Sequence, residues 1–294
     1  MKRRLYTLDV FTTKPYAGNP LAVVTDGDGL STRTMQAIAK EMNLAETVFV
    51  QKPTSDRALA RLRIFTTEQE LPLAGHPVIG TWFLLAELGV VPAREGTVHV
   101  WQQTGAGVLP VEIEFEDGRP LCVTMTQRAA KFKRPRISKP TLAAALGLKA
   151  SDFDSSLPLE AVSTGVFNLM VPLRRRETLK RIQVNPHALL KAMGGEGTVA
   201  YCFALGKRGE AFARGMLPWA IQEDPATGSA GGSLAAYLVH HGRHEARKPL
   251  EILQGVEMGR PSHIYAFVLP LEQAKLVPLV RGCAVRILEA TIEA

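Results

Sequence analysis

Two stretches of the chain decide its fold, ELPLAGHPVIGTWFLLAELG (70–89) and EDPATGSAGGSLAAYLVHHG (223–242). They align without a gap at a constant offset of 153 residues (223 − 70 = 153), close to half of the 294-residue chain. The identical pairs include Glu70–Glu223, Pro72–Pro225, Gly75–Gly228 and Gly89–Gly242. Just upstream, ARLRIF (60–65) resembles AFARGM (211–216). An internal repeat at this spacing predicts two halves of related structure.

Each repeated stretch contains a helix pattern that is apolar on nearly all faces, from Val78 to Leu88 and from Leu234 to Val239. A helix of this kind must be buried, so the surrounding segments should enclose it. Those segments read as strands: 5–11, 21–26, 46–51, 58–65, 96–102, 109–115, 121–127, 264–270, 275–280 and 283–293. We therefore predict an α+β fold of two pseudo-symmetric domains. Each is a curved mixed β-sheet or barrel wrapped around a central buried α-helix.

The predicted first domain covers residues 1–127 with roughly 281–294, and the second covers residues 128–280. The basic segment RAAKFKRPRISK (128–139) is the expected crossover between them. One surface helix is also predicted, with Ser31 as its N-cap, an apolar stripe that includes Met35 and Ala39, and Asn43 at its end.

The starts of the two buried helices are candidate anion sites. A helix N-terminus presents unpaired N–H groups and partial positive charge, and the glycines at 228, 231 and 232 let a ligand approach the backbone. The alternative is that these small residues only allow tight helix packing and that Asp224 is an N-cap. Two copies at a fixed offset favour a ligand cleft between the two domains.

Composition and charge narrow the class of ligand. The hydrophobic fraction of 46% and charged fraction of 21% are typical of a globular protein, and the net charge is +7. The basic segments lack the interleaved aromatic residues that nucleic-acid binding needs, so we expect no nucleic acid and favour an anionic small molecule.

No apolar run reaches membrane-spanning length, and Met1-Lys-Arg-Arg is not followed by a signal-peptide core. We expect a cytoplasmic protein without a membrane partner.

Metal and cofactor motifs are weak. Three cysteines (Cys122, Cys202 and Cys283) without CxxC spacing suggest neither a disulfide framework nor a zinc site. His240, His241 and His244 cluster, but we interpret them as cationic residues at a helix C-terminus, and we predict no metal. GSAGGS (228–233) lacks the lysine of a phosphate-binding loop, and GAG (105–107) lacks the third glycine of a dinucleotide fingerprint. No organic cofactor is expected.

Five motifs give the sequence a resemblance to a known family: YTLDVFTTKPYAGNPLAVV (6–24), NLAETVFV (43–50), LAGHPVIGT (73–81), EDPATGSA (223–230) and LQGVEMGRPS (253–262). In this order they resemble the PhzF-like isomerases of phenazine biosynthesis, which share the diaminopimelate-epimerase fold with the active site between two domains. The resemblance implies a homodimeric, cofactor-independent isomerase that moves a proton within a small cyclic amino-carboxylate. The first choice of substrate is trans-2,3-dihydro-3-hydroxyanthranilate.

The resemblance also assigns roles to residues. Glu46 of NLAETVFV would remove a proton from one substrate carbon and return it to another, which a carboxyl can do when burial brings its pKa toward neutrality. The expected catalytic partners are His76, Asp224 and Ser229, and the expected substrate-binding residues are Asn19, Gly75, Thr227 and Gly228. The residues alone also allow a structural interpretation. Glu46 would then be a solvated charge, His76 a histidine at a helix start whose hydrogen-bonding groups are paired, and Ser229 a residue that serves packing.

Related epimerases of this fold use two cysteines, and Ala74 and Thr227 occupy the equivalent positions here. Neither can carry a proton at a useful pKa, so two-cysteine racemisation is not expected. The chain departs from the family pattern at Ala74 and at FTT (65–67). These positions concern the shape of the pocket, and so the identity of the substrate, more than the acid–base chemistry. Two alternatives stay open: an epimerase or isomerase of another amino or hydroxy acid, and a non-catalytic small-molecule-binding protein.

Overall fold

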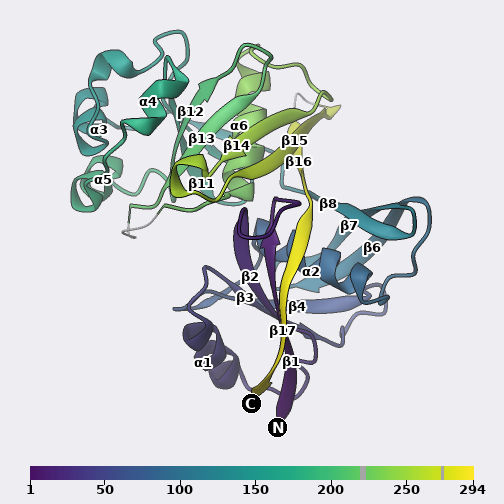
Figure 1. The fold of residues 1–294 in the computed structure, drawn as a ribbon. Helices are drawn as coiled ribbons and strands as arrows, with labels where there is room; N and C mark the ends of the chain where they lie inside the picture. The colour runs from purple at the N-terminus through teal and green to yellow at the C-terminus, as the bar shows by residue number, and fades with distance from the viewer. Residues whose placement is uncertain (219–222, 273–274) are drawn as a thin grey trace. The chain divides into compact units, whose positions relative to one another are not determined.

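Two 13-residue helices, α2 (Gly75–Glu87) and α6 (Gly228–His240), occupy the centres of the two halves of the chain (Figure 1). Both their starts and their ends differ by 153 residues, as the repeat predicts (228 − 75 = 153, 240 − 87 = 153). Ten residues of each are buried, so neither has a solvent-facing stripe. We call α2 and α6 the central helices.

The computed structural model describes residues 1–218, 223–272 and 275–294. It divides into unit 1 (Met1–Thr126 with Arg281–Ala294) and unit 2 (Gln127–Val280). Besides α2, unit 1 holds β1 (Lys2–Val10), β2 (Asn19–Val24), α1 (Thr32–Met42), β3 (Thr47–Gln51), β4 (Ala60–Phe65), β5 (Glu70–Leu71), β6 (Gly96–Thr104), β7 (Gly107–Glu116), β8 (Arg119–Thr126) and β17 (Ala284–Glu293).

Unit 2 has more helix than unit 1. Around α6 it contains β9 (Lys131–Lys133), α3 (Lys139–Ala145), β10 (Glu160–Ser163), β11 (Phe167–Pro172), α4 (Arg176–Lys180), α5 (Pro186–Met193), β12 (Ala200–Leu205), β13 (Ala211–Met216), β14 (Leu250–Gln254) and β15 (Ser262–Pro270). Two short 3-10 turns lie at Ala150–Asp152 and Val256–Met258, and β16 (Leu276–Gly282) leads out of the unit toward β17.

The two units repeat one pairing pattern. In unit 1 the successive pairs β1–β2, β2–β3, β3–β4, β4–β6 and β6–β7 are antiparallel, parallel, antiparallel, parallel and antiparallel. In unit 2 the pairs β10–β11, β11–β12, β12–β13, β13–β14 and β14–β15 follow the same series. β4 and β13 even share the alternation of buried and half-buried residues. The predicted α+β fold, with mixed sheets curved around central buried helices, is confirmed.

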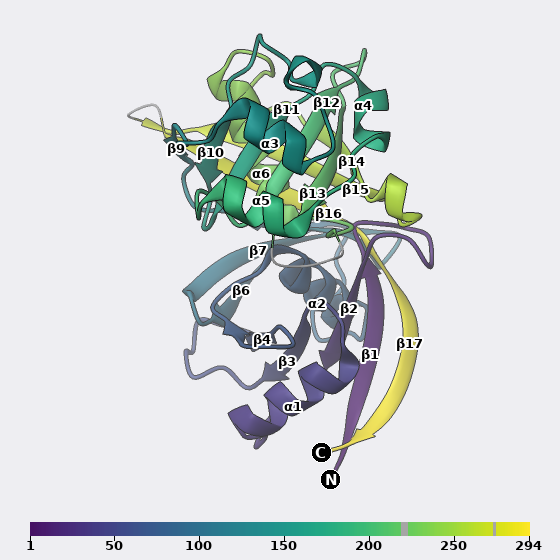
Figure 2. The same ribbon diagram turned by 90° about the vertical axis from the view of Figure 1, so that its left-hand side faces the viewer.

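The first and last strands of the chain lie side by side in unit 1. β17 pairs antiparallel with β1, from Lys2 opposite Glu293 to Val10 opposite Ala284 (Figures 1 and 2). The chain therefore returns to its starting unit after completing unit 2, and its C-terminal segment, 281–294, belongs to the sheet around α2.

The basic segment 128–139 is not only a connection, because residues 131–133 form β9, which pairs with β10. Ser138 then caps α3 by accepting from the Thr141 N–H. Helices α3 and α5 lie together on the outside of unit 2 (Figure 2), where their apolar residues pack in one core cluster with those of α4, β11 and β12. These helices and most strands of unit 2 were missing from the sequence prediction.

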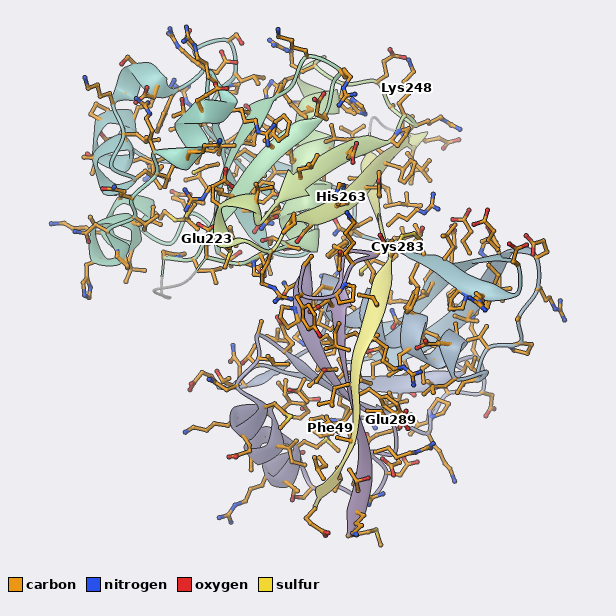
Figure 3. The ribbon with its side chains drawn as sticks, viewed as in Figure 1. Phe49, Glu223, Lys248, His263, Cys283 and Glu289 are labelled. Atoms are coloured by element: carbon orange, nitrogen blue, oxygen red, sulfur yellow. A yellow bond between two sulfur atoms is a disulfide. The ribbon has the colours of Figure 1, made fainter. Side chains whose placement is uncertain are left out.

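The expectation about the cysteines was wrong for two of the three. Cys122 in β8 and Cys283, directly before β17, form a disulfide within unit 1, across 161 residues of sequence (Figure 3). Cys202 is a buried free thiol, and burial raises its pKa to about 12, so it is a small apolar core residue. No helix in the described ranges is long and apolar enough to cross a membrane.

Candidate active site

In unit 1, three predicted site residues meet at the start of α2. Nε2 of His76 lies 3.4 Å from Oε2 of Glu46, and Nδ1 of His76 lies 3.5 Å from Nδ2 of Asn19. Asn19 opens β2, and Glu46 directly precedes β3, which runs parallel to β2. The Ala22 N–H donates to the backbone carbonyl of Glu46. The parallel pair therefore holds the amide and the carboxylate on either side of the imidazole.

His76 is a neutral imidazole. Burial removes it from water and lowers its pKa from 6.5 to about 3, although a hydrogen bond with the backbone of Pro20 acts in the opposite direction. A neutral imidazole carries one proton. On Nε2 that proton points toward the Glu46 carboxylate; on Nδ1 it leaves Nε2 as an acceptor for a protonated Glu46. The pair can therefore accommodate Glu46 in both of its protonation states.

The Glu46 side chain is shielded but can be reached from outside. It is 17% exposed, against 7% for the side chain of His76. Gly75 begins α2, and Ala74 at the N-cap has no side chain that could accept from the first turn. This part of unit 1 thus combines an accessible carboxyl, a neutral imidazole and a helix start, which suits proton transfer to and from a bound anion.

In unit 2, a buried glutamine organises the segment that leads into α6. Oε1 of Gln254 accepts from the Thr227 N–H at 3.0 Å and from the Tyr201 hydroxyl at 2.8 Å. Its Nε2 donates to the Asp224 carbonyl at 2.7 Å and to Oγ1 of Thr227 at 2.9 Å. Gln254 is fully buried and makes four hydrogen bonds, so it fixes the backbone around Asp224.

Thr227 supports Asp224. Its hydroxyl donates to Oδ2 of Asp224 at 2.7 Å, and its backbone N–H donates to Oε1 of Gln254. With 7% exposure, it has less access to a ligand than Asp224, which is half-buried. These contacts orient the Asp224 carboxylate, and the binding of substrate by Thr227 stays a prediction.

Ser229 is the accessible residue of the first turn of α6. Its neighbours Gly228, Ala230 and Gly231 are buried, whereas Ser229 is half-buried. The backbone carbonyl of Gly228 accepts from Nε2 of Gln127 at 3.0 Å, which ties the helix start to the chain entering unit 2. The Ser229 hydroxyl is therefore available at the same helix end as Asp224.

The eight predicted residues fall into two groups, one at the start of each central helix. Unit 1 brings together Asn19, Glu46, Gly75 and His76, and unit 2 brings together Asp224, Thr227, Gly228 and Ser229. Ala74 and Thr227, the positions that correspond to paired cysteines in related epimerases, are the N-caps of the two helices. Gln254 and Tyr201 were missed, although Gln254 lies within the motif LQGVEMGRPS.

Replacing Gln254 with Met is expected to destabilise the protein by about 2–4 kcal/mol. The change removes four hydrogen bonds and leaves the Tyr201 hydroxyl and the Thr227 N–H buried without this partner. Urea unfolding measures the loss. The control is Gln36→Met, because Gln36 is half-buried and its side chain donates to the Thr66 carbonyl. Equal losses in the two variants would contradict the role given to Gln254.

Comparison with known proteins identifies the family to which the chain is similar. The family model for phenazine biosynthesis-like proteins (PhzC-PhzF) matches residues 8–290. The chain is 37% identical over 264 residues to the trans-2,3-dihydro-3-hydroxyanthranilate isomerase of Pseudomonas aeruginosa, covering 90% of this chain and 89% of the relative. The crystal structure of a PhzF-family phenazine biosynthesis protein from Bacillus anthracis superposes with a TM-score of 0.90 at 30% identity, over 100% of both chains.

A more distant structure shows how far the fold extends. A hydroxyproline epimerase from Agrobacterium vitis matches with a TM-score of 0.70 at 12% identity, over 99% of this chain and 92% of the epimerase. The likeness at this identity concerns the fold alone. It agrees with the expectation, drawn from the repeat and the family resemblance, that the chain shares the epimerase architecture.

Proposed function

The chain belongs to the phenazine biosynthesis-like (PhzC-PhzF) family, and from that membership we propose that it is an isomerase with Glu46 as its acid and base. The substrate class is a small cyclic amino-carboxylate. The observation that carries the proposal is the pair formed by Glu46 and a neutral His76, with 3.4 Å between Oε2 and Nε2.

The proposed reaction is a proton shift that needs no redox step. Ionised Glu46 removes a proton from one substrate carbon, so that a C–H bond breaks and a carboxyl O–H bond forms while the electron pair moves into the substrate's double-bond system. The partly exposed carboxyl of Glu46 exchanges its proton with the solvent and then donates a proton to a second carbon on the same face. One carboxyl suffices for this shift, whereas stereoinversion requires an acid and a base on opposite faces.

The residues at the start of α6 are proposed to bind the substrate. Asp224, oriented by Thr227, receives the substrate amino group, and the Ser229 hydroxyl and the backbone at Gly228 receive its carboxylate. Asn19 and Gly75 contribute to binding from unit 1. We further expect a cytoplasmic homodimer that uses no cofactor; light scattering on purified protein measures the oligomeric state.

Our proposed substrate is trans-2,3-dihydro-3-hydroxyanthranilate. The Pseudomonas aeruginosa relative is named as an isomerase of this compound. The test is proton NMR in D₂O with the wild-type chain and this compound. Isomerised product that has gained solvent deuterium at one carbon supports both the substrate and the proton shift. Unchanged compound in the presence of folded protein rules out this substrate. If another amino-carboxylate of a test panel then takes up deuterium, the proposed isomerase activity stands and that compound becomes the proposed substrate.

A further inference from the structure

At the C-terminal end of α6, three side chains with metal-binding atoms come together. His240 is the last residue of the helix, His241 is its C-cap, and Glu160 is the first residue of β10. One ligand atom from each lies within 4.8 Å of the others. A 13-residue helix is about 20 Å long, so this cluster is well separated from Asp224 and Ser229 at the other end.

The three side chains are already oriented by their surroundings. Nε2 of His241 lies 2.9 Å from Oε2 of Glu160. The His240 ring stacks on Phe132 of β9, with 4.3 Å between the ring centroids and 20° between their planes. The two imidazoles are 4.9 Å apart, centroid to centroid. Much of the side-chain ordering that metal binding requires is therefore present without a metal.

We propose that Glu160, His240 and His241 form a site for a divalent transition metal, of which Zn²⁺ is the main candidate. Two imidazoles and one carboxylate match the donors that zinc accepts, whereas Ca²⁺ and Mg²⁺ prefer oxygen ligands alone. Tetrahedral ligands about 2.1 Å from zinc lie roughly 3.4 Å from one another. The 2.9 Å between His241 and Glu160 and the 4.8 Å limit for all three pairs are compatible with that value, and the exposed His240 needs only a small side-chain adjustment.

The site connects two parts of unit 2. A cavity of about 400 Å³ borders Glu160. A metal held here would tie the start of β10 to the end of the central helix α6. We therefore assign the site a stabilising role: bound Zn²⁺ raises the melting temperature, because a ligand that binds only the folded state favours that state.

The test uses the full chain without a histidine tag, stripped of metal by a chelator, and titrated with ZnCl₂ by calorimetry. We expect one Zn²⁺ per chain, at least about tenfold weaker binding in His240→Ala, and a rise in melting temperature that this variant loses. The matched control is His263→Ala. His263 lies on β15 (Figure 3), with its Nδ1 2.9 Å from Oε1 of Glu251, a histidine–glutamate pair without a neighbouring second histidine.

A second measurement counts the ligands directly. Electron paramagnetic resonance with Cu²⁺ at one equivalent should show two imidazole nitrogens in the wild type and one in His240→Ala, while His263→Ala should match the wild type. Circular dichroism establishes that the variants are folded. The proposal is overturned if no stoichiometric Zn²⁺ binding occurs, if His240→Ala binds like the wild type, or if His263→Ala loses as much affinity as His240→Ala.

Discussion

Replacing Glu46 with Gln is expected to lower kcat of the proton shift by about 10³- to 10⁴-fold, the upper part of the range for loss of a general acid–base group. The amide keeps the size of the carboxylate but can neither remove the substrate proton nor return it. Because substrate binding is assigned mainly to residues of unit 2, KM should change much less than kcat. Product formation and deuterium uptake, followed by proton NMR in D₂O, measure both stages of the transfer.

The matched control is Glu41→Gln, five residues earlier in the sequence. Glu41 is exposed on α1, and its conversion to Gln changes the net charge by the same amount as Glu46→Gln. It should turn over substrate at the wild-type rate. If folded Glu46→Gln keeps more than about a tenth of the wild-type kcat, Glu46 is not the group that moves the proton, and the proposed mechanism is wrong.

The sequence alone was sufficient for features set by local patterns. The apolar repeat located both central helices, because a helix without a polar stripe can only be buried. The caps of α1 were also predictable: the Ser31 side chain accepts from the Thr34 N–H, and Asn43 ends the helix in the left-handed conformation. The candidate site residues came from the family resemblance, and Gly75, His76, Gly228 and Ser229 among them lie at the helix starts that the repeat located.

Two kinds of feature were not predictable: very short helices, and contacts between residues that are distant in sequence. The helices α3, α4 and α5 are only five to eight residues long, too short to show a clear helical period. Cys122 and Cys283 meet only because β17 returns to unit 1. Similarly, Gln254 acquires its role from Tyr201 and Thr227, which are far from it in sequence but adjacent once β12, β14 and the start of α6 are assembled.

The neutrality of His76 has a consequence for stability in acid. Its pKa is about 3 when folded and about 6.5 when unfolded, so between these values the unfolded state binds the extra proton. Stability therefore falls as the pH falls from 6.5 toward 3; above 6.5 this group contributes no pH dependence. The difference of about 3.5 pKa units corresponds to a loss on the order of 5 kcal/mol, of which roughly 2 kcal/mol appears by pH 5.

Urea unfolding of the wild type and of His76→Asn between pH 7 and pH 4 measures this contribution. The variant starts from a different stability at pH 7, because it also changes the contacts of His76 with Glu46 and Asn19. The comparison therefore rests on the slope with pH, which should be much shallower in His76→Asn. His187→Asn, at an exposed position, should keep the wild-type slope. Parallel curves for wild type and His76→Asn would mean that His76 takes up its proton equally in both states, and that Glu46 faces an imidazole able to become a cation.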